Sequence, residues 1–211
     1  MYQNQAISGS PSFTLANLLR GRLAEQILTI LLEHHGYRVS RVGIEKLVPE
    51  VKYLGRDQYL SLGLPDQLRT IPDLLIVDPG IEWARLFEVK FRRSFDRKTA
   101  NELFAKLTDQ REYWPESWAV IVRGQAPDPA RFHQDYFRVI PPEQTWLLQS
   151  PRGIDIPTDE CQAMELWWEQ LPWLNTVFRF RDFERYGDER DARGWNFLAD
   201  ADSITQLIRE L

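Results

Sequence analysis

Two carboxylates and one ammonium group lie close together in the middle of the chain. Asp73 follows Pro72 at the start of the apolar segment DLLIVD, and Glu88 and Lys90 belong to the apolar segment LFEVKF. Because side chains alternate across a strand, Glu88 and Lys90 share one face while their apolar neighbours share the other. In a hairpin that turns at Pro79-Gly80, Asp73 would lie across from Glu88.

Two neighbouring carboxylates are the ligands that a hard divalent cation prefers, and they suit Mg²⁺ or Mn²⁺. The backbone carbonyl of Val89 offers a further oxygen ligand. Such an ion polarises a phosphoryl oxygen and favours the ionisation of a water molecule. The Lys90 ammonium would steady the developing negative charge. The pattern therefore predicts a metal-dependent phosphodiesterase in which Asp73, Glu88 and Lys90 are catalytic and Asp73, Glu88 and Val89 hold the metal.

The two short motifs, Pro-Asp and Glu-Val-Lys, occur more than once in the chain. Only the surrounding sequence distinguishes the candidate site from the other copies. Glu-Val-Lys also occurs at 50–52, and Pro-Asp also occurs at 65–66 and 127–128. None of these copies joins an apolar strand to a second one, whereas Asp73 and Glu88 do. A solvated aspartate beside a surface glutamate–lysine pair is the alternative interpretation, because a short string alone is a weak signal.

The periodicity of apolar residues predicts an α/β domain. Helical spacing is expected at 14–35 and 99–114, and segment 43–70 is left unassigned because prolines and glycines break it. Strands are expected at 37–42, 73–78, 81–92, 118–122 and 136–140. The first three strands would be antiparallel, and the second helix would cross over to the fourth strand.

This order of residues resembles the PD-(D/E)xK nuclease superfamily, which includes restriction endonucleases, Holliday-junction resolvases and RecB-like nucleases. Glu25 on the leading helix matches members in which that acid is an extra metal ligand. Gln110 and Tyr113 loosely match a glutamine and a tyrosine of RecB-like members. The resemblance covers about residues 14–122. It implies a restriction endonuclease-like core, with a mixed four- to five-stranded sheet flanked by helices, and Mg²⁺-dependent cleavage of nucleic acid.

Basic residues follow the second hairpin strand, where a phosphate backbone would approach. Arg92, Arg93, Arg97 and Lys98 are therefore predicted to bind nucleic acid, and Gln110 to contact the backbone or orient the lysine. A solvated charge run remains the alternative. The net charge of −5 does not support this prediction. However, only five of the 26 basic residues are lysines, and the remaining arginines are better suited to binding phosphate.

Composition sets the remaining bounds. A chain of 211 residues with 43% hydrophobic residues can bury one core, and we expect a nuclease-like core at 1–140 and a mainly helical C-terminal extension at 141–211, packed on that core. The single cysteine, Cys161, excludes an intrachain disulfide and a cysteine-based metal cluster. The chain contains no glycine-rich phosphate loop, so no small-molecule cofactor is expected. No apolar run reaches the length of a membrane span. A cytoplasmic protein is expected.

The expected activity is Mg²⁺-dependent hydrolysis of DNA by an endonuclease, because no motor segment accompanies the site. A catalytically inactive nuclease fold that binds nucleic acid or protein is the alternative, and an RNA-directed nuclease stays open. Homodimerisation is also left open, with the Trp-rich C-terminal region as the candidate surface.

Overall fold

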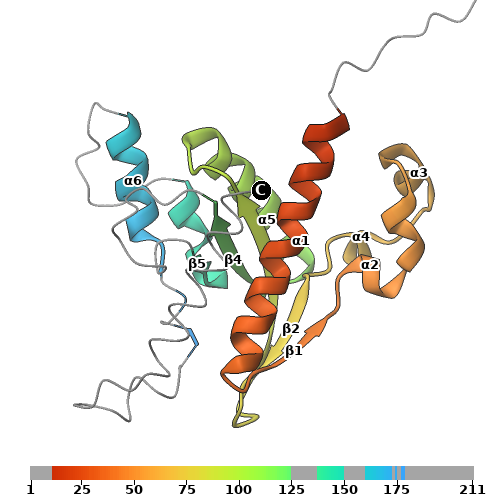
Figure 1. Ribbon diagram of the computed structural model, residues 1–211, viewed down its shortest axis with the longest axis horizontal. Coiled ribbons are helices and arrows are strands. Elements are labelled where there is room, and N and C mark those ends of the chain that lie inside the picture. The colour runs from red at the N-terminus through yellow and green to blue at the C-terminus, as the bar shows by residue number, and fades with distance from the viewer. Residues whose placement is uncertain (1–10, 125–136, 150–159, 173, 175–176, 179–211) are drawn as a thin grey trace, which may run out of the picture.

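One open sheet of five strands forms the centre of the protein (Figure 1). The computed structural model describes residues 11–124, 137–149, 160–172, 174 and 177–178. The strands are β1 (Arg38–Arg41), β2 (Leu74–Val77), β3 (Ala84–Arg92), β4 (Trp118–Arg123) and β5 (Phe137–Ile140). The larger helices are α1 (Pro11–His34), α5 (Arg97–Tyr113) and α6 (Glu160–Gln170). The shorter ones are α2 (Ile44–Leu47), η1 (Pro49–Tyr53), α3 (Arg56–Ser61), α4 (Asp66–Arg69) and η3 (Pro142–Leu148).

The spatial order of the strands follows their order in the chain, β1-β2-β3-β4-β5. Strands β1, β2 and β3 pair antiparallel, β3 and β4 pair parallel, and β5 returns antiparallel to β4. A parallel pair needs a long crossover connection, and α5 provides it between β3 and β4. The expected α/β class, a mixed sheet flanked by helices, is confirmed.

Helix α1 covers one face of the sheet. Its buried residues recur at the spacing of one helical face: Ala24, Ile27, Leu28, Leu31 and Leu32. They pack against Phe87 and Val89 of β3 and Val120 of β4. Burying one such side chain is worth about 1.5–3 kcal/mol, so this stripe fixes the helix on the sheet.

The opposite face is covered by α5, η3 and α6. Leu103 and Leu107 of α5 share a core with Leu148 of η3 and Trp168 of α6. Phe95, just before α5, packs against Trp168 with ring centroids 5.1 Å apart. The described parts of the extension therefore share their core with the sheet. The boundary expected at residue 140 stays a prediction, and residues 179–211 of the extension lie outside the described residues.

The alternation of side chains along the inner strands separates the two cores. In β4, Val120 and Val122 face α1, whereas Ala119 and Ile121 face α5 and α6. In β3, Phe87 and Val89 face α1, so Glu88 and Lys90 project toward α5. The polar residues Glu88 and Lys90 of β3 therefore lie on the side of the sheet that α5 covers.

The loop between β2 and β3 is longer than the predicted Pro79-Gly80 turn, and β3 begins at Ala84 rather than at residue 81. The Asp78 carboxylate accepts hydrogen bonds from the backbone N–H groups of Gly80 at 3.0 Å and Trp83 at 2.9 Å. Ile81 has a left-handed φ of 59°. The hydrogen bonds of Asp78 thus stabilise a loop between β2 and β3, and β3 begins after this loop.

Segment 43–70, left unassigned from the sequence, forms a helical arm that contains α2, η1, α3 and α4 and stands beside α1 (Figure 1). Both ends of the arm are held at the sheet. The backbone N–H groups of Val42 and Gly43 donate to the carbonyl of Asp73 at 2.9 and 3.3 Å. Large apolar side chains of the arm, Leu47, Tyr53 and Leu60, are exposed.

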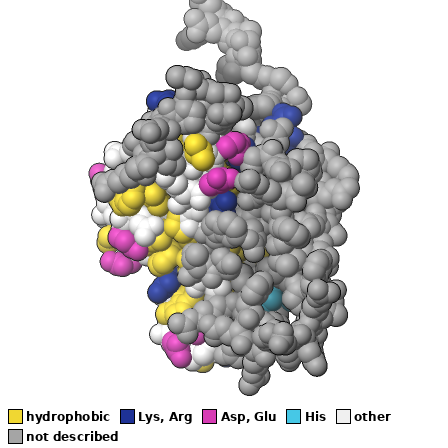
Figure 2. All heavy atoms as spheres, turned by 90° about the vertical axis from the view of Figure 1, so that its left-hand side faces the viewer, with side chains coloured by type: hydrophobic (Ala, Val, Ile, Leu, Met, Phe, Trp, Pro, Cys, Tyr) yellow, Lys and Arg dark blue, Asp and Glu magenta, His cyan; other side chains and the backbone are white. Residues whose placement is uncertain are grey.

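On the side of the molecule where α6 lies, the visible described surface mixes hydrophobic side chains with acidic and basic ones (Figure 2). The described tryptophans of α6, Trp167 and Trp168, are buried in the core, so they do not form the surface suggested for a homodimer. Within the described ranges, no helix has the length and apolar character needed to cross a membrane.

Candidate metal and phosphodiester site

The β2–β3 hairpin brings Asp73 close to Glu88. The last residue pair of the ladder is Leu74 with Phe87, and Asp73 and Glu88 are the next residues of the chain beyond that pair. Both carboxylates line one cleft.

The Asp73 carboxylate is fixed where the ladder between β2 and β3 ends. Its Oδ2 accepts a hydrogen bond of 2.8 Å from the backbone N–H of Val89. Burial, followed by the nearby negative charge of Glu88, raises the pKa of Asp73 to about 8, although Lys90 acts in the opposite direction. The Asp73 carboxyl therefore keeps its proton to a higher pH than an exposed aspartate does.

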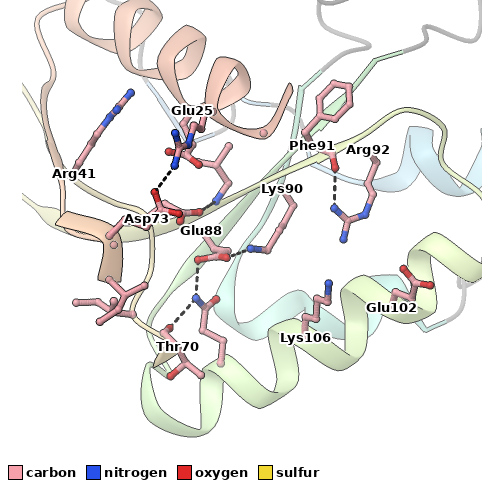
Figure 3. Close-up of a pocket in the computed structure, with 18 of the residues that line it drawn as sticks. Glu25, Arg41, Thr70, Asp73, Glu88, Lys90, Phe91, Arg92, Glu102 and Lys106 are labelled. Atoms are coloured by element: carbon pink, nitrogen blue, oxygen red, sulfur yellow. Dashed lines mark hydrogen bonds and ion pairs between the residues drawn. The ribbon is translucent and has the colours of Figure 1, made fainter. Parts of the chain in front are cut away.

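Both oxygens of the buried Glu88 carboxylate have partners (Figure 3). The Lys90 ammonium donates to Oε1. The Gln110 amide of α5 donates to Oε2 at 2.7 Å and to the carbonyl of Thr70 at 3.0 Å. Two acceptors fix the orientation of this amide. Its own oxygen, Oε1, is buried and has no hydrogen-bond partner among the described residues.

Lys90 is a cation in this arrangement. Burial alone would lower the pKa of its ammonium, but the adjacent Glu88 and Asp73 carboxylates outweigh that effect and raise the pKa above its usual value. At neutral pH Lys90 is therefore protonated. It can pair with an anion or donate a hydrogen bond, but it does not start as a base.

Glu25 projects from α1 toward the same region (Figure 3). Burial raises the pKa of its carboxyl, and Arg41 opposes that rise. In the part of the chain that the structure describes, no three His, Cys, Asp or Glu side chains are grouped closely enough to hold a metal ion. Of the two neighbouring carboxylates, Glu88 acts more strongly than Glu25 on the pKa of Asp73, which both raise.

These residues open into one cleft of about 940 Å³ between α1, the helical arm, β3 and α5. Eight basic and five acidic side chains line it, although the chain as a whole has a net charge of −5. Several of the cations have partners within the protein: Arg22 pairs with Glu45 at 3.0 Å. A basic cleft around a small acidic centre is suited to a phosphate-bearing ligand.

The residues predicted to bind nucleic acid fall into two groups, those that line the cleft and those that lie outside it. Arg92 and Arg93 line the cleft, as does the buried Gln110. Arg97 and Lys98 are exposed at the start of α5, outside the lining. Tyr113, half of the Gln–Tyr resemblance, also lies outside the lining, and its hydroxyl is 3.5 Å from a carboxylate oxygen of Asp66.

Sequence reasoning missed Lys106, Arg41 and Thr70, which also line the cleft. Lys106 precedes Gln110 by four residues, so both lie on one face of α5. That spacing was a usable signal for Lys106. The contribution of Thr70 is its backbone carbonyl, which no pattern of side chains could have indicated.

The donor set fits a divalent cation. Mg²⁺ uses one or two carboxylates and keeps several waters, which matches Asp73 and Glu88. The Oδ1 atom of Asp73 has no hydrogen bond to a described residue.

The fold and the site define an α/β protein in which a buried and a half-buried carboxylate and one ammonium line a basic cleft. No family model matches the chain, and no curated protein or solved structure matches it either. The family resemblance therefore stays a prediction from the residues, and the function is inferred from geometry and charge.

Proposed function

We propose that this protein is a divalent-metal-dependent nuclease with a PD-(D/E)xK, restriction endonuclease-like core, and that it hydrolyses phosphodiester bonds in DNA as an endonuclease. The single observation that carries the proposal is the convergence of three side chains: the Asp73 carboxylate accepts a hydrogen bond from the N–H of Val89, next to Glu88, and the Lys90 ammonium donates to Glu88. The basic lining of the surrounding cleft supports a polyanionic substrate.

Asp73 and Glu88, with the carbonyl of Val89, would hold Mg²⁺ or Mn²⁺. A cation bound there supplies Lewis-acid polarisation of the phosphoryl oxygen and a lowered pKa for water. Asp73 has to lose its proton before it can act as a ligand, because the pKa of its carboxyl is raised to about 8 by burial and by Glu88. Gln110 keeps the Glu88 carboxylate in one orientation through Oε2.

Lys90 assists the reaction as a positive charge. Its ammonium donates to Glu88 Oε1 in the protein alone. If Glu88 held a cation, that ammonium would be available to a nonbridging oxygen of the phosphodiester. A preorganised cation at the developing charge stabilises the transition state in a site partly shielded from water. The raised pKa of Lys90, caused by Glu88 and Asp73 against the effect of burial, keeps it charged for this role.

The repeated motif in the chain provides a matched test. Purified full-length protein is incubated with Mg²⁺ or Mn²⁺ and single-stranded, duplex or branched DNA, with RNA as a parallel substrate. We expect cleavage of DNA, loss of cleavage in Glu88→Gln, and unchanged cleavage in Glu50→Gln, since Glu50 is an exposed copy of the Glu-Val-Lys motif. Equal rates for Glu88→Gln and the parent would refute the assignment. Binding of metal and DNA without any cleavage would favour the inactive binding subunit instead.

A further inference from the structure

Two cations face each other across the cleft beyond Lys90. Arg92 is the next residue of β3 on the same side of the strand as Glu88 and Lys90, and Lys106 points from α5 toward it (Figure 3). Two residues of strand span about 6.6 Å, which is comparable to the spacing of successive phosphates in an extended nucleic-acid strand. Arg92 therefore lies about one nucleotide step beyond Lys90.

The Lys106 ammonium has no ion pair or hydrogen bond with a described residue. The Arg92 guanidinium donates through Nη1 to the carbonyl of Phe91 at 2.7 Å, which leaves its other donors available. Both groups line the cleft wall. Glu102 is the acid near them, so this part of the cleft combines two cations with one carboxylate.

We propose that Arg92 and Lys106 form a second phosphate subsite, which holds the backbone phosphate adjacent to the one bound at Asp73 and Glu88. This inference rests on the proposed nuclease function and names the part of the substrate that the same cleft grips. It adds Lys106, a residue outside the predicted nucleic-acid set, and it assigns to Arg92 one particular phosphate. The guanidinium offers two parallel donors and the ammonium a point charge from the opposite wall.

The electrostatics of the protein without ligand agree with this geometry. Burial, and then the positive charges of Arg92 and Lys90, lower the pKa of Lys106, while Glu102 opposes the change. Burial also lowers the pKa of Arg92. Like charges held together in a partly desolvated cleft repel each other, and a bound phosphate would relieve that repulsion.

The first test measures binding without cleavage. Full-length protein in EDTA is titrated against a fluorescein-labelled oligodeoxynucleotide at several salt concentrations. Lys106→Met should weaken binding about tenfold at low salt and reduce the slope of log Kd against log[salt] by about 1, the loss of one phosphate contact. Arg38→Met is the matched control, because Arg38 is exposed on β1 outside the cleft lining. The double variant Lys106→Met/Arg92→Gln should cost less than the sum of the single changes, since both groups contact one phosphate.

The second test locates the contact along the strand. A single neutral methylphosphonate linkage in the oligonucleotide should suppress cleavage by the parent at the neighbouring bond on one side, and Lys106→Met should lose that position-specific effect. Equal Kd values and salt slopes for Lys106→Met and Arg38→Met would overturn the proposal. A methylphosphonate pattern that is the same in Lys106→Met and the parent would also overturn it, and would leave at most a site for free phosphate. If no metal supports cleavage, the proposed function fails, whereas the binding test still decides the subsite.

Discussion

The amide of Gln110 connects helix α5 to Glu88 by a hydrogen bond of 2.7 Å, and the same nitrogen donates to the carbonyl of Thr70 at 3.0 Å. One buried side chain thus joins α5, the end of the helical arm and strand β3. Gln110 is 6% exposed, so water cannot replace these bonds. Under the proposed function it would be a positioning residue, because its contact with the reaction centre is the hydrogen bond to Glu88.

Replacing Gln110 with Ala should lower both stability and turnover. A buried hydrogen bond to a charged group is worth about 1.5–3 kcal/mol, and the free energy of unfolding in urea should fall by about that amount. The value of kcat should fall more than KM rises, because Glu88 loses its orientation and the cations of the cleft remain. Thr108→Ala, an exposed change on the same helix, should alter stability by less than about 0.5 kcal/mol. Equal effects of the two changes would contradict this role.

Asp73 predicts an unusual dependence of stability on pH in metal-free protein. The pKa of its carboxyl is raised from 3.8 to about 8, by burial and by Glu88, so the folded protein binds more protons than the unfolded chain between these values. Stability should therefore fall as the pH rises through that window. Asp73→Asn removes the titration and should be more stable than the parent by about 1.4 kcal/mol or more at pH 8 and above. Denaturation curves at several pH values in EDTA test this, with exposed Asp66→Asn as the control; parallel profiles for parent and Asp73→Asn would argue against it.

Metal affinity should depend on pH for the same reason. The Asp73 carboxyl, whose pKa burial and Glu88 raise to about 8, has to release its proton on binding Mg²⁺ or Mn²⁺. Below that pH, the apparent Kd for the metal should rise about tenfold for each unit by which the pH falls. Calorimetric titration in two buffers of different ionisation enthalpy would count the released proton. An affinity independent of pH, with no proton release, would place the metal elsewhere.

Glu25 should be less important than Glu88, because its charge acts less strongly than that of Glu88 in raising the pKa of the Asp73 carboxyl. Glu25→Gln should weaken Mg²⁺ binding by only a few-fold, since it removes a nearby negative charge and leaves the close carboxylate pair intact. Cleavage at saturating metal should persist. If Glu25→Gln abolished cleavage as completely as Glu88→Gln does, Glu25 would be a direct ligand during turnover.

Two glycines should respond to alanine with opposite signs. A Cβ at Gly124 would lie 2.7 Å from Cζ of Phe91, the residue between Lys90 and Arg92, whereas a Cβ at Gly21 on α1 meets nothing within 4 Å. Gly124→Ala should destabilise the protein by about 1–3 kcal/mol through overpacking. Gly21→Ala should stabilise it by about 0.5–1 kcal/mol through helix propensity. Thermal unfolding of both variants measures the contrast, and a neutral Gly124→Ala would mean that Phe91 moves without cost.

The sequence predicted those parts of the site that depend on the alternation of side chains along a strand. The alternation along β3 places Glu88 and Lys90 on one face, and the β2–β3 hairpin brings the Asp73 carboxylate to the backbone of Val89 between them. It did not predict the helical arm, where prolines and glycines interrupt any periodicity. Lys106 and the Thr70 carbonyl join the site only through the packing of α5 against the sheet, which no local pattern encodes. The Asp78 loop was missed because it depends on one side chain that bonds its own neighbours.

The two ends of the helical arm are tied to the residues that would do the chemistry: Gly43 donates to the carbonyl of Asp73, and the Thr70 carbonyl accepts from Gln110. Between those ends the arm also contacts α1, through the ion pair of Arg22 with Glu45, and the end of α5, through the hydrogen bond from Trp114 to the carbonyl of Gln67. Under the proposed function, the arm would contact the substrate beside the reaction centre, because Glu45, Lys46 and Arg69 line the same cleft.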